Sequence, residues 1–251
     1  MDSFVFWDDN PVERSKVKRF TPEVEVIEPP EDVSLWPSLL KSIEYFSKIK
    51  LTKEDLKKHK QYKQRSKFVL EKNNSADESQ YLKSINLNIS SLNISSQNLS
   101  RASQLTLKTN QFNLTTKKYT TGEINNIANN HKYIKIYGKL IDKHGDNGLI
   151  AITIGQLKYK QCHIDLWLMS CRVLKRDMEF VMLDELVARC REKGIFELIG
   201  YYNKSVKNSM VSDLYEKFGF ELYGRNGENT IWKLNIENYE NKNKFIGVVS
   251  E

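Results

Sequence analysis

Strand-like and helix-like patterns alternate through the second half of the chain, and this alternation limits the possible folds more than any other feature. Short apolar runs are separated by amphipathic stretches, one of which stops on Gly194, as helices often do. The predicted strands are 133–142, 149–160, 162–170, 195–202 and 229–236, and the predicted helices are 176–194 and 206–219. We therefore expect an α/β protein with a mixed sheet and helices on its faces.

The first half of the chain is less regular. Residues 1–20 read as a strand, a turn and the start of a helix, and residues 27–37 read as a proline-rich linker or wrapping segment. Residues 38–70 look helical, and 85–94 alternate like a strand. Residues 97–130 contain two helical stretches around the polar run "KTNQFNLTTKKYT".

Positive charge is concentrated in one stretch of the 251 residues. The chain has 39 Lys and Arg against 32 Asp and Glu, a net charge of +7, and residues 41–72 alone contain eleven basic and four acidic residues. This stretch is either a solvated basic helix or a docking face for an acidic partner, either nucleic acid or an acidic carrier protein. Zinc-finger spacing and RNA-binding aromatic motifs are missing, so we do not expect nucleic-acid binding.

The cysteine content and hydropathy indicate the compartment. Cys162, Cys171 and Cys190 are too few for a disulfide framework. No apolar run approaches the roughly 18 residues of a membrane span, and we find no signal peptide at the N-terminus. We expect a cytoplasmic protein with no membrane partner.

The opening stretch "FVFWDDNPVERSKV" places Asp8 and Asp9 directly after an apolar run. Enzymes with parallel sheets present carboxylates in this way at the carboxyl end of a strand. A single strand has nothing to pair with, so we expect the opening segment to be poorly ordered by itself.

Several motifs resemble known families. The run "NSMVSDLYEKFGF", with Asn208, Tyr215, Gly219 and Phe220, resembles the closing helix of the GNAT-type acyltransferase fold. Together with "FWDDNPVERSKV", "KTNQFNLTTKKYT", "DKHGDNGLIA" and "DLWLMSCRVLKRDME", it resembles the FkbH-like family from residue 4 to about 235. Members of that family join a haloacid-dehalogenase-type (HAD-like) phosphatase domain to a GNAT-like domain.

The resemblance implies an organisation of the chain into a HAD-like (Rossmannoid) phosphatase remnant, a basic helical linker, a GNAT-like acyltransferase domain and a tail. The phosphatase remnant would span residues 1–37 and the linker 38–79. The acyltransferase domain would span 80–236 and the tail 237–251. In the family's final phosphatase motif, Asp8 and Asp9 help to hold Mg²⁺. The chain has no D-x-D nucleophile motif, so we expect the C-terminal portion of a longer protein, or a split or truncated gene, whose phosphatase half acts in cis or in trans.

The resemblance also implies a function. The family loads a small acyl unit, typically glyceryl from a phosphorylated glycerate, onto the phosphopantetheine of an acyl carrier protein for polyketide or related secondary-metabolite biosynthesis. We expect this chain to be the acyltransferase portion, moving the acyl unit through a cysteine thioester. Two alternatives stay open: a GNAT-type N-acetyltransferase that uses acetyl-CoA, and a non-catalytic fragment that docks a carrier protein.

Cys171 is the candidate nucleophile. It directly follows a predicted strand and opens a predicted helix, where main-chain amides stabilise a thiolate. Arg172, Lys175 and Arg176 add positive charge nearby, which lowers a thiol pKa. Position alone fits a small buried residue equally well, and the resemblance of "MSCRVLKR" favours the nucleophile. The other two cysteines are expected in the core.

Polar residues elsewhere are candidates for binding the substrate or the carrier. Those of the polar run, which can hold an acyl hydroxyl or an oxyanion or else form turns and caps, are Asn110, Gln111, Asn113 and Thr115. Asn208 is a further candidate, and so are Asp146 and Asn147, which otherwise build a hairpin turn.

Two GNAT features bear on the cofactor. GNAT enzymes hold the acyl-CoA pyrophosphate on a loop patterned R/Q-x-x-G-x-G/A, and the equivalent run here has Lys175 and Asp177 in place of glycine. Crowding by the lysine and repulsion by the aspartate argue against ordinary acetyl-CoA, whereas a phosphopantetheine arm has a single phosphate. Tyr215 is either a general acid for the departing thiolate or a packing aromatic.

Overall fold

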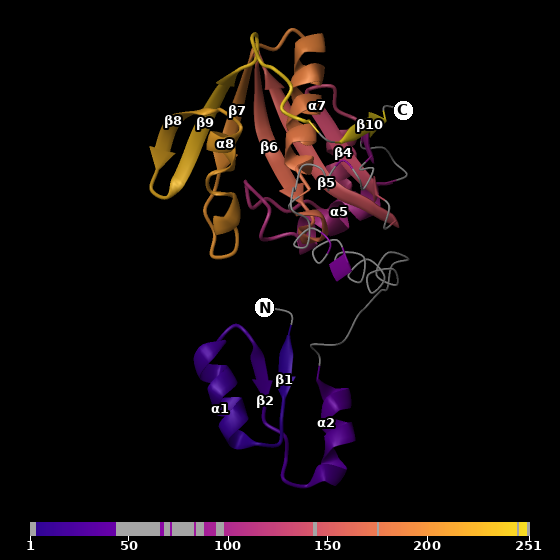
Figure 1. Cartoon of the computed structure of the whole chain (residues 1–251), viewed down its shortest axis with the longest axis vertical. Helices are drawn as coiled ribbons and strands as arrows, with labels where there is room; N and C mark the ends of the chain where they lie inside the picture. Colours follow the sequence, from indigo (N-terminus) through magenta and orange to yellow (C-terminus); the bar gives the residue numbers. More distant parts are fainter. Residues whose placement is uncertain are drawn as a thin grey trace. The chain divides into compact units, whose positions relative to one another are not determined.

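The computed structural model describes residues 4–43, 66, 67, 71, 83, 88–93, 98–142, 145–174, 176–244 and 246–249. The chain divides into two units, Met1–Leu56 and Lys57–Glu251 (Figure 1). Most of the predicted basic linker at 38–79 lies outside the described residues, so a docking face there stays a prediction.

Two short parallel strands form the centre of the smaller unit. β1 (Val5–Trp7) pairs with β2 (Glu25–Ile27), and α1 (Pro11–Phe20) connects them. α1 begins where the side chain of Asn10 accepts a hydrogen bond from the amide of Val12 and a proline takes the first helical position. The expectation of a strand without a partner is wrong, because β2 supplies the partner within the same unit.

The remaining elements of the smaller unit are η1 (Val33–Leu35) and α2 (Trp36–Ser42). Trp36 at the start of α2 packs edge to face on Trp7 of β1, with ring centroids 5.7 Å apart. All side chains of residues 4–43 are half-buried or exposed. Residues 4–43 therefore form a β-α-β arrangement without a fully buried core among themselves.

One mixed sheet forms the centre of the larger unit. Among the described residues its order is β10-β3-β4-β5-β6-β7-β9-β8, and β10–β3 and β6–β7 are its parallel pairs. The strands are β3 (Asn88–Asn93), β4 (Tyr133–Asp142), β5 (Gly145–Lys158), β6 (Gln161–Met169), β7 (Glu197–Tyr202), β8 (Glu221–Asn226), β9 (Asn229–Asn235) and β10 (Gly247–Val249). The predicted α/β class with a mixed sheet is confirmed.

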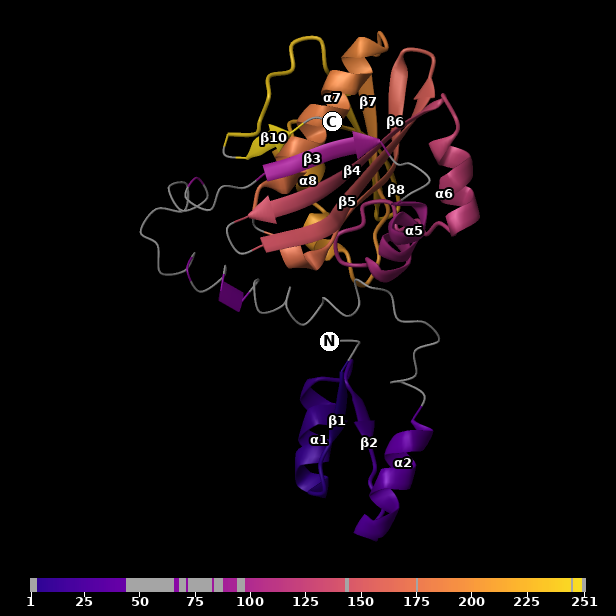
Figure 2. The same cartoon turned by 90° about the vertical axis from the view of Figure 1, so that its right-hand side faces the viewer.

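Helices cover both faces of this sheet, with α7 and α8 on one face and α5 and α6 on the other (Figures 1 and 2). Their bounds are α5 (Leu99–Lys108), α6 (Thr121–Ala128), α7 (Met178–Glu192) and α8 (Leu214–Lys217), with the 3-10 helices η4 (Cys171–Val173) before α7 and η5 (Ser209–Val211) before α8. Buried apolar side chains form one core on each face. None of the helices among the described residues has the length and apolar character of a membrane span.

Local sequence sets the ends of these helices. α6 starts at a capping box, in which Thr120 accepts from the amide of Glu123 and the Glu123 carboxylate accepts from the amide of Thr120. α7 ends two residues before Gly194, whose left-handed backbone (φ 66°) turns the chain toward β7. Met178 and Leu186 of α7 are buried against the sheet.

A β-bulge interrupts β6. Ile154 of β5 lies opposite Leu166, and the next residue, Gly155, lies opposite Ile164, which leaves Asp165 without an opposite residue. An additional residue of this kind bends the strand and exchanges the faces to which its side chains point. The bulge therefore changes the direction of β6 halfway along its length.

β6 and β7 pair only before the bulge. Their register covers Gln161–His163 of β6 and Glu197–Ile199 of β7, and the strands then diverge (Figure 1). Residues 112–115, which we call the wedge, occupy the space between the end of β6 and the residues after β7.

The wedge completes the hydrogen bonding of both strands. The Leu114 amide donates to the carbonyl of Trp167 (3.0 Å), and the Met169 amide donates to the carbonyl of Phe112 (3.1 Å). On the other side, the Asn203 amide donates to the carbonyl of Leu114 (2.8 Å). Main-chain groups that the divergence leaves without a strand partner are thereby satisfied.

A buried carboxylate anchors the C-terminal tail to α7. Asp184 accepts hydrogen bonds from the Tyr239 hydroxyl (2.5 Å) and from the amides of Lys242 and Asn243 (2.9 Å each). From this anchor the chain continues to β10, which pairs with β3. Part of the segment predicted as a tail, 237–251, therefore belongs to the sheet.

Two features of the fold differ from the sequence predictions. β8 and β10 were not predicted; β8 lies at the edge of the sheet with mostly exposed side chains, so it lacks an apolar signal. The helix expected at 206–219 is divided into η5 and the four-residue α8. Ser, Asn and Asp are frequent in this stretch, and their side chains compete for main-chain hydrogen bonds.

Gly200 of β7 is a test of the packing between the sheet and α8. A Cβ at this position would overlap the ring of Tyr215, which is completely buried. We expect Gly200→Ala to lower the free energy of unfolding by about 1–3 kcal/mol because the ring cannot move aside. Urea denaturation measures this change. Gly122→Ala is the control, because a Cβ there meets nothing within 4 Å; equal stability of the two variants would contradict the prediction.

Candidate functional site

Cys171 is the accessible cysteine of the larger unit. It is half-buried, whereas the other two cysteines are completely buried, as predicted for core residues. It follows β6, whose last residue, Met169, bonds to the wedge. The intervening Ser170 donates its amide to the carbonyl of Ile150 on β5 (2.7 Å). The wedge on one side and β5 on the other therefore fix the main chain that leads to the thiol.

Cys171 opens a helix, as predicted, but that helix is η4, a 3-10 helix of only three residues. The long helix α7 begins only at Met178. Asp177 separates the two helices with a left-handed backbone (φ 56°), the conformation that glycine adopts without strain. Because one turn has few aligned peptide dipoles, it stabilises a thiolate less than a long helix would.

Of the cations predicted around the thiol, the structure describes one side chain. Arg176 is completely buried, so its charge lies inside the unit and not on a ligand-facing surface. Lys175 and the side chain of Arg172 lie outside what the structure describes. Positive charge beside the thiol therefore stays a prediction.

A polar cavity of about 350 Å³ lies beside the wedge. One wall comes from the chain between α5 and α6, and the opposite wall comes from the loop after β7. Two lysines and no carboxylate are among its described lining residues, so its charge favours an anionic or oxygen-rich ligand. The lining residues are Thr109, Asn110, Asn113, Thr116, Lys118, Ser205, Val206 and Lys207.

The structure separates the four predicted residues of the polar run. Asn110 and Asn113 line the cavity, whereas Gln111 is exposed and Thr115 is buried, and neither of these two is in the lining. Asn113 is 1 % exposed; its Nδ2 donates to the carbonyl of Lys117 (3.1 Å), and its Oδ1 has no donor among the described residues. The Asn113 side chain therefore keeps an acceptor position that no described donor fills.

The predicted pair in the hairpin turn bonds locally. The Asp146 carboxylate accepts from the amide of Gly148 (2.7 Å), and Asn147 Nδ2 donates to the carbonyl of Gly145 (3.3 Å). These are turn-building contacts. Neither residue lines the cavity, although β5, on which both lie, contacts η4.

Tyr215 and Asn208 are both completely buried. The Tyr215 hydroxyl accepts from the amide of Tyr201 (3.2 Å), its ring packs on Gly200, and burial raises its pKa far above the ordinary value. These are the contacts of a packing aromatic. The Asn208 side chain bonds to the wedge and to the loop after β7, which corrects the expectation that it contacts a ligand directly.

A second cavity, of about 430 Å³, lies at the start of α7. It includes Asp177, the residue directly before α7. Lysines outnumber carboxylates in its lining, so a phosphate group would be attracted there. The lining residues are Asp177, Phe180, Lys217, Glu240, Asn241, Lys242 and Lys244.

Sequence reasoning missed two polar clusters on the sheet. Asp165, the bulge residue, contacts Lys117 and the hydroxyl of Tyr119. Nδ1 of His163 lies 2.7 Å from the hydroxyl of Tyr201, and burial lowers the pKa of His163, so the imidazole is neutral at pH 7. In each cluster the partners are distant in sequence, and no local pattern could have indicated them.

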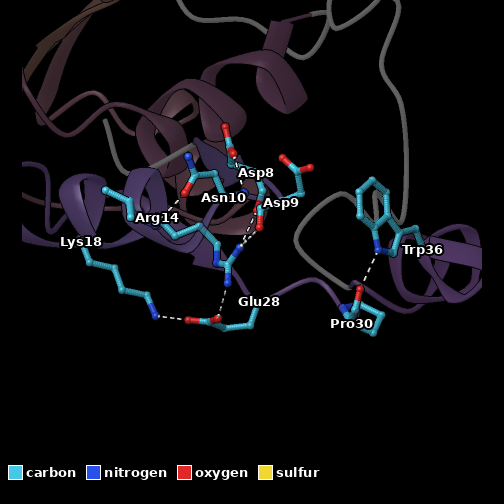
Figure 3. Close-up of polar contacts among 9 residues, drawn as sticks. Asp8, Asp9, Asn10, Arg14, Lys18, Glu28, Pro30 and Trp36 are labelled. Carbon is cyan, nitrogen blue, oxygen red and sulfur yellow. Dashed lines mark hydrogen bonds and ion pairs between the residues drawn. The ribbon is translucent and has the colours of Figure 1, made fainter. Parts of the chain in front are cut away.

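The predicted metal ligands lie in the smaller unit (Figure 3). Asp8 accepts a hydrogen bond from the amide of Asn10 (2.9 Å), and Arg14 donates to the main-chain carbonyls of Asp8 and Asp9 and pairs with Glu28 (3.3 Å). The described residues contain no group of three or more side chains that could hold a metal. Mg²⁺ is usually held by one or two carboxylates together with substrate phosphates and waters, so Mg²⁺ binding by Asp8 and Asp9 stays a prediction for a complete phosphatase domain.

Neither a protein-family model nor a curated protein matches the chain. Among solved structures, it is similar to the ribosomal-protein-S18-alanine N-acetyltransferase of Escherichia coli (12 % identity over 62 % of this chain and 99 % of that chain, TM-score 0.46). It is also similar to the PaiA N-acetyltransferase of Thermoplasma acidophilum in complex with coenzyme A (15 % identity over 59 % of this chain and 98 % of that chain, TM-score 0.46). A mutant of the spermidine N-acetyltransferase SpeG of Vibrio cholerae is 12 % identical over 61 % of this chain and 96 % of that chain, with a TM-score of 0.45. Similarity at this level concerns the arrangement of helices and strands and not the reaction.

Tyr215→Phe distinguishes a packing role of this residue from a catalytic one. The change leaves the amide of Tyr201 without its acceptor, so we expect the free energy of unfolding to fall by about 1 kcal/mol. We expect the acyl-transfer rate to change by less than about tenfold, because the hydroxyl is enclosed. Urea denaturation and a transfer assay measure the two effects, with Tyr159→Phe at an exposed position as the control. A loss of transfer rate of about a hundredfold or more, without a matching loss of stability, would show that Tyr215 is a general acid.

Proposed function

We propose that the larger unit is an acyltransferase in which Cys171 holds the acyl group as a thioester. The main support is the position of this half-buried residue, which only Ser170 separates from the end of β6. The end of β6 bonds to the wedge, and Asn113 of the wedge lines the polar cavity. A cysteine for structure alone would be expected in the core, as the other two cysteines are.

The chemistry is an exchange of thioesters in two steps. In the first step the Cys171 thiolate attacks the carbonyl carbon of an acyl thioester, and the donor sulfur leaves and takes up the proton that Cys171 gave up. In the second step an acceptor thiol attacks the acyl-cysteine, and Cys171 leaves. Each step forms one carbon–sulfur bond and breaks another, with no oxidation or reduction.

The polar cavity supports a small hydroxylated acyl unit of the glyceryl type. Asn110 and Asn113 line the cavity, and Lys118 donates to Oδ1 of Asn110 (2.8 Å), which orients that amide for an acyl hydroxyl. The acyl unit would pass to the phosphopantetheine thiol of an acyl carrier protein. Such an arm supplies a thiol on a flexible chain, and the lysines that line the second cavity, Lys217, Lys242 and Lys244, would hold its phosphate.

A second candidate is direct N-acetylation of an amine with acetyl-CoA. The lysine-rich cavity at the start of α7 favours it, because coenzyme A brings several phosphates to any site that binds it. Residues 112–114 of the wedge occupy the hydrogen-bonding edge of β6 after the bulge. Coenzyme A and a carrier's phosphopantetheine have the same amide-containing arm, so this constraint applies to both candidates and does not separate them.

Intact-protein mass spectrometry tests the thioester. The full chain is mixed with the N-acetylcysteamine thioester of glycerate and, in parallel, with that of acetate. We expect a mass gain of one acyl group, faster with the glyceryl donor, that is absent in Cys171→Ala and that an added small thiol removes.

Native alkylation with iodoacetamide is the control for accessibility. Because the other two cysteines are completely buried, we expect one modification in the folded wild type and none in Cys171→Ala. Prompt alkylation of Cys171 without any acyl adduct would refute the thioester. Acetyl-CoA binding together with acetylation of a polyamine or peptide amine would then favour the second candidate.

A further inference from the structure

Two asparagines bind three consecutive carbonyl groups of the wedge. The Asn203 amide donates to the carbonyl of Leu114 (2.8 Å), and Nδ2 of the same residue donates to the carbonyl of Thr115 (3.1 Å). Nδ2 of Asn208 donates to the carbonyl of Asn113 (2.9 Å). Main-chain and side-chain donors from the region after β7 thus bind the wedge, in addition to the bonds that it makes with β6.

Both the nitrogen and the oxygen of the Asn208 side-chain amide take part in hydrogen bonds within the protein. Besides the bond to the wedge, Nδ2 donates to the carbonyl of Asn203 (2.9 Å). Oδ1 accepts from the amide of Ser205 (2.8 Å) and from the hydroxyl of Tyr202 (3.3 Å). The residue is 0 % exposed, so both of its donors and its acceptor are used within the protein.

The bonds of Asn208 reach both walls of the polar cavity. Asn113 belongs to one wall and Ser205 to the other, and Asn208 bonds to the main chain of each. We infer that Asn208 is a positioning residue: it sets the distance between the two walls and, through the wedge, steadies the end of β6 that leads to Cys171. This inference rests on the proposed function only where it concerns the rate of acylation.

Asn208→Asp is the most selective change. It keeps the size of the side chain and the oxygen that accepts from Ser205 and Tyr202. It replaces the donating NH₂ by an oxygen that faces the carbonyls of Asn113 and Asn203, so attraction becomes repulsion. Asn129→Asp is the matched control, because it also removes an amide donor to a main-chain carbonyl, that of Asn125, but at an exposed position at the end of α6.

Hydrogen–deuterium exchange of the full chain measures the positioning directly. In Asn208→Asp we expect the peptides that cover 110–118 and 200–208 to exchange about tenfold faster, because the bonds that hold the wedge are lost. The peptides of β4 and α7 should exchange as in the wild type. Unchanged exchange at the wedge would overturn the inference, whether or not the protein transfers acyl groups.

Acylation kinetics measure the effect on the cavity. With the glyceryl thioester as the probe, we expect the half-saturating concentration to rise about tenfold in Asn208→Asp, while the maximal rate falls by less than threefold and iodoacetamide alkylates Cys171 at the wild-type rate. A purely structural role would leave the half-saturating concentration unchanged, and that result would overturn the inference. A wild type without any acyl adduct refutes the proposed function instead, and the exchange result then decides the role of Asn208.

A milder variant covers the case in which Asn208→Asp does not fold. Asn203→Asp keeps the main-chain bond to Leu114 and loses only the side-chain bond to Thr115. We expect the same direction of change in exchange and in half-saturation, at about threefold. Wild-type values in both measurements would overturn the inference.

Discussion

The larger unit depends on one additional residue in β6. Main-chain amides and carbonyls inside a protein must find partners, and a regular strand finds them on its two neighbours. At Asp165 this rule cannot be met by neighbouring strands alone, because the bulge bends β6 away from β7. Residues 112–115 take over the pairing, and they bring a polar stretch from the first half of the unit into the centre of the sheet. Asn113 of the wedge lines the polar cavity, and the wedge bonds to the end of β6 that leads to Cys171.

The site is assembled from segments that are distant in sequence and that main-chain hydrogen bonds hold together. The wedge bonds to β6 on one side and to the region after β7 on the other, and β5 holds the residue before Cys171. Strands and main-chain bonds are stiffer than surface side chains, so the thiol and the cavity wall keep a defined relation. The aspartates of the smaller unit belong to a separate β-α-β arrangement, and the chemistry proposed for Cys171 does not require them.

Much of this fold was predictable because local patterns of apolar and polar residues indicate its helices and strands. The hairpin of β4 and β5, the apolar strand before Cys171 and the helix that ends near Gly194 all have periodic apolar residues and matching end signals. Asn110 and Asn113 of the polar run line the polar cavity, and their role in binding stays a prediction. The bulge at Asp165 could not be predicted from the sequence. It changes which side chains of β6 face each side of the sheet, and this change is visible only from the register with β5.

Other parts of the site depend on long-range partners or on backbone conformation. Lys118 and Ser205 line the cavity only because the wedge brings two distant segments together. The separation of η4 from α7 depends on the left-handed backbone of Asp177, a residue type that usually indicates a helix start and not an interruption. Tyr215 and Asn208 belong to a run that resembles a family motif, and the motif does not say whether they contact a ligand. Their complete burial indicates that they pack and bond within the protein.

The anchoring of the tail by Asp184 also has a kinetic consequence. β10 pairs in parallel with β3, the first strand among the described residues of the larger unit, and so joins segments that are far apart in its sequence. Contacts between residues so far apart must close a very long loop, and such contacts form slowly. Hairpins such as β4–β5 and β8–β9 close short loops, so we expect them to form before the β3–β10 pair, which follows the segment that Asp184 anchors. We therefore expect this edge of the sheet to stay exposed longest to other molecules while the protein folds.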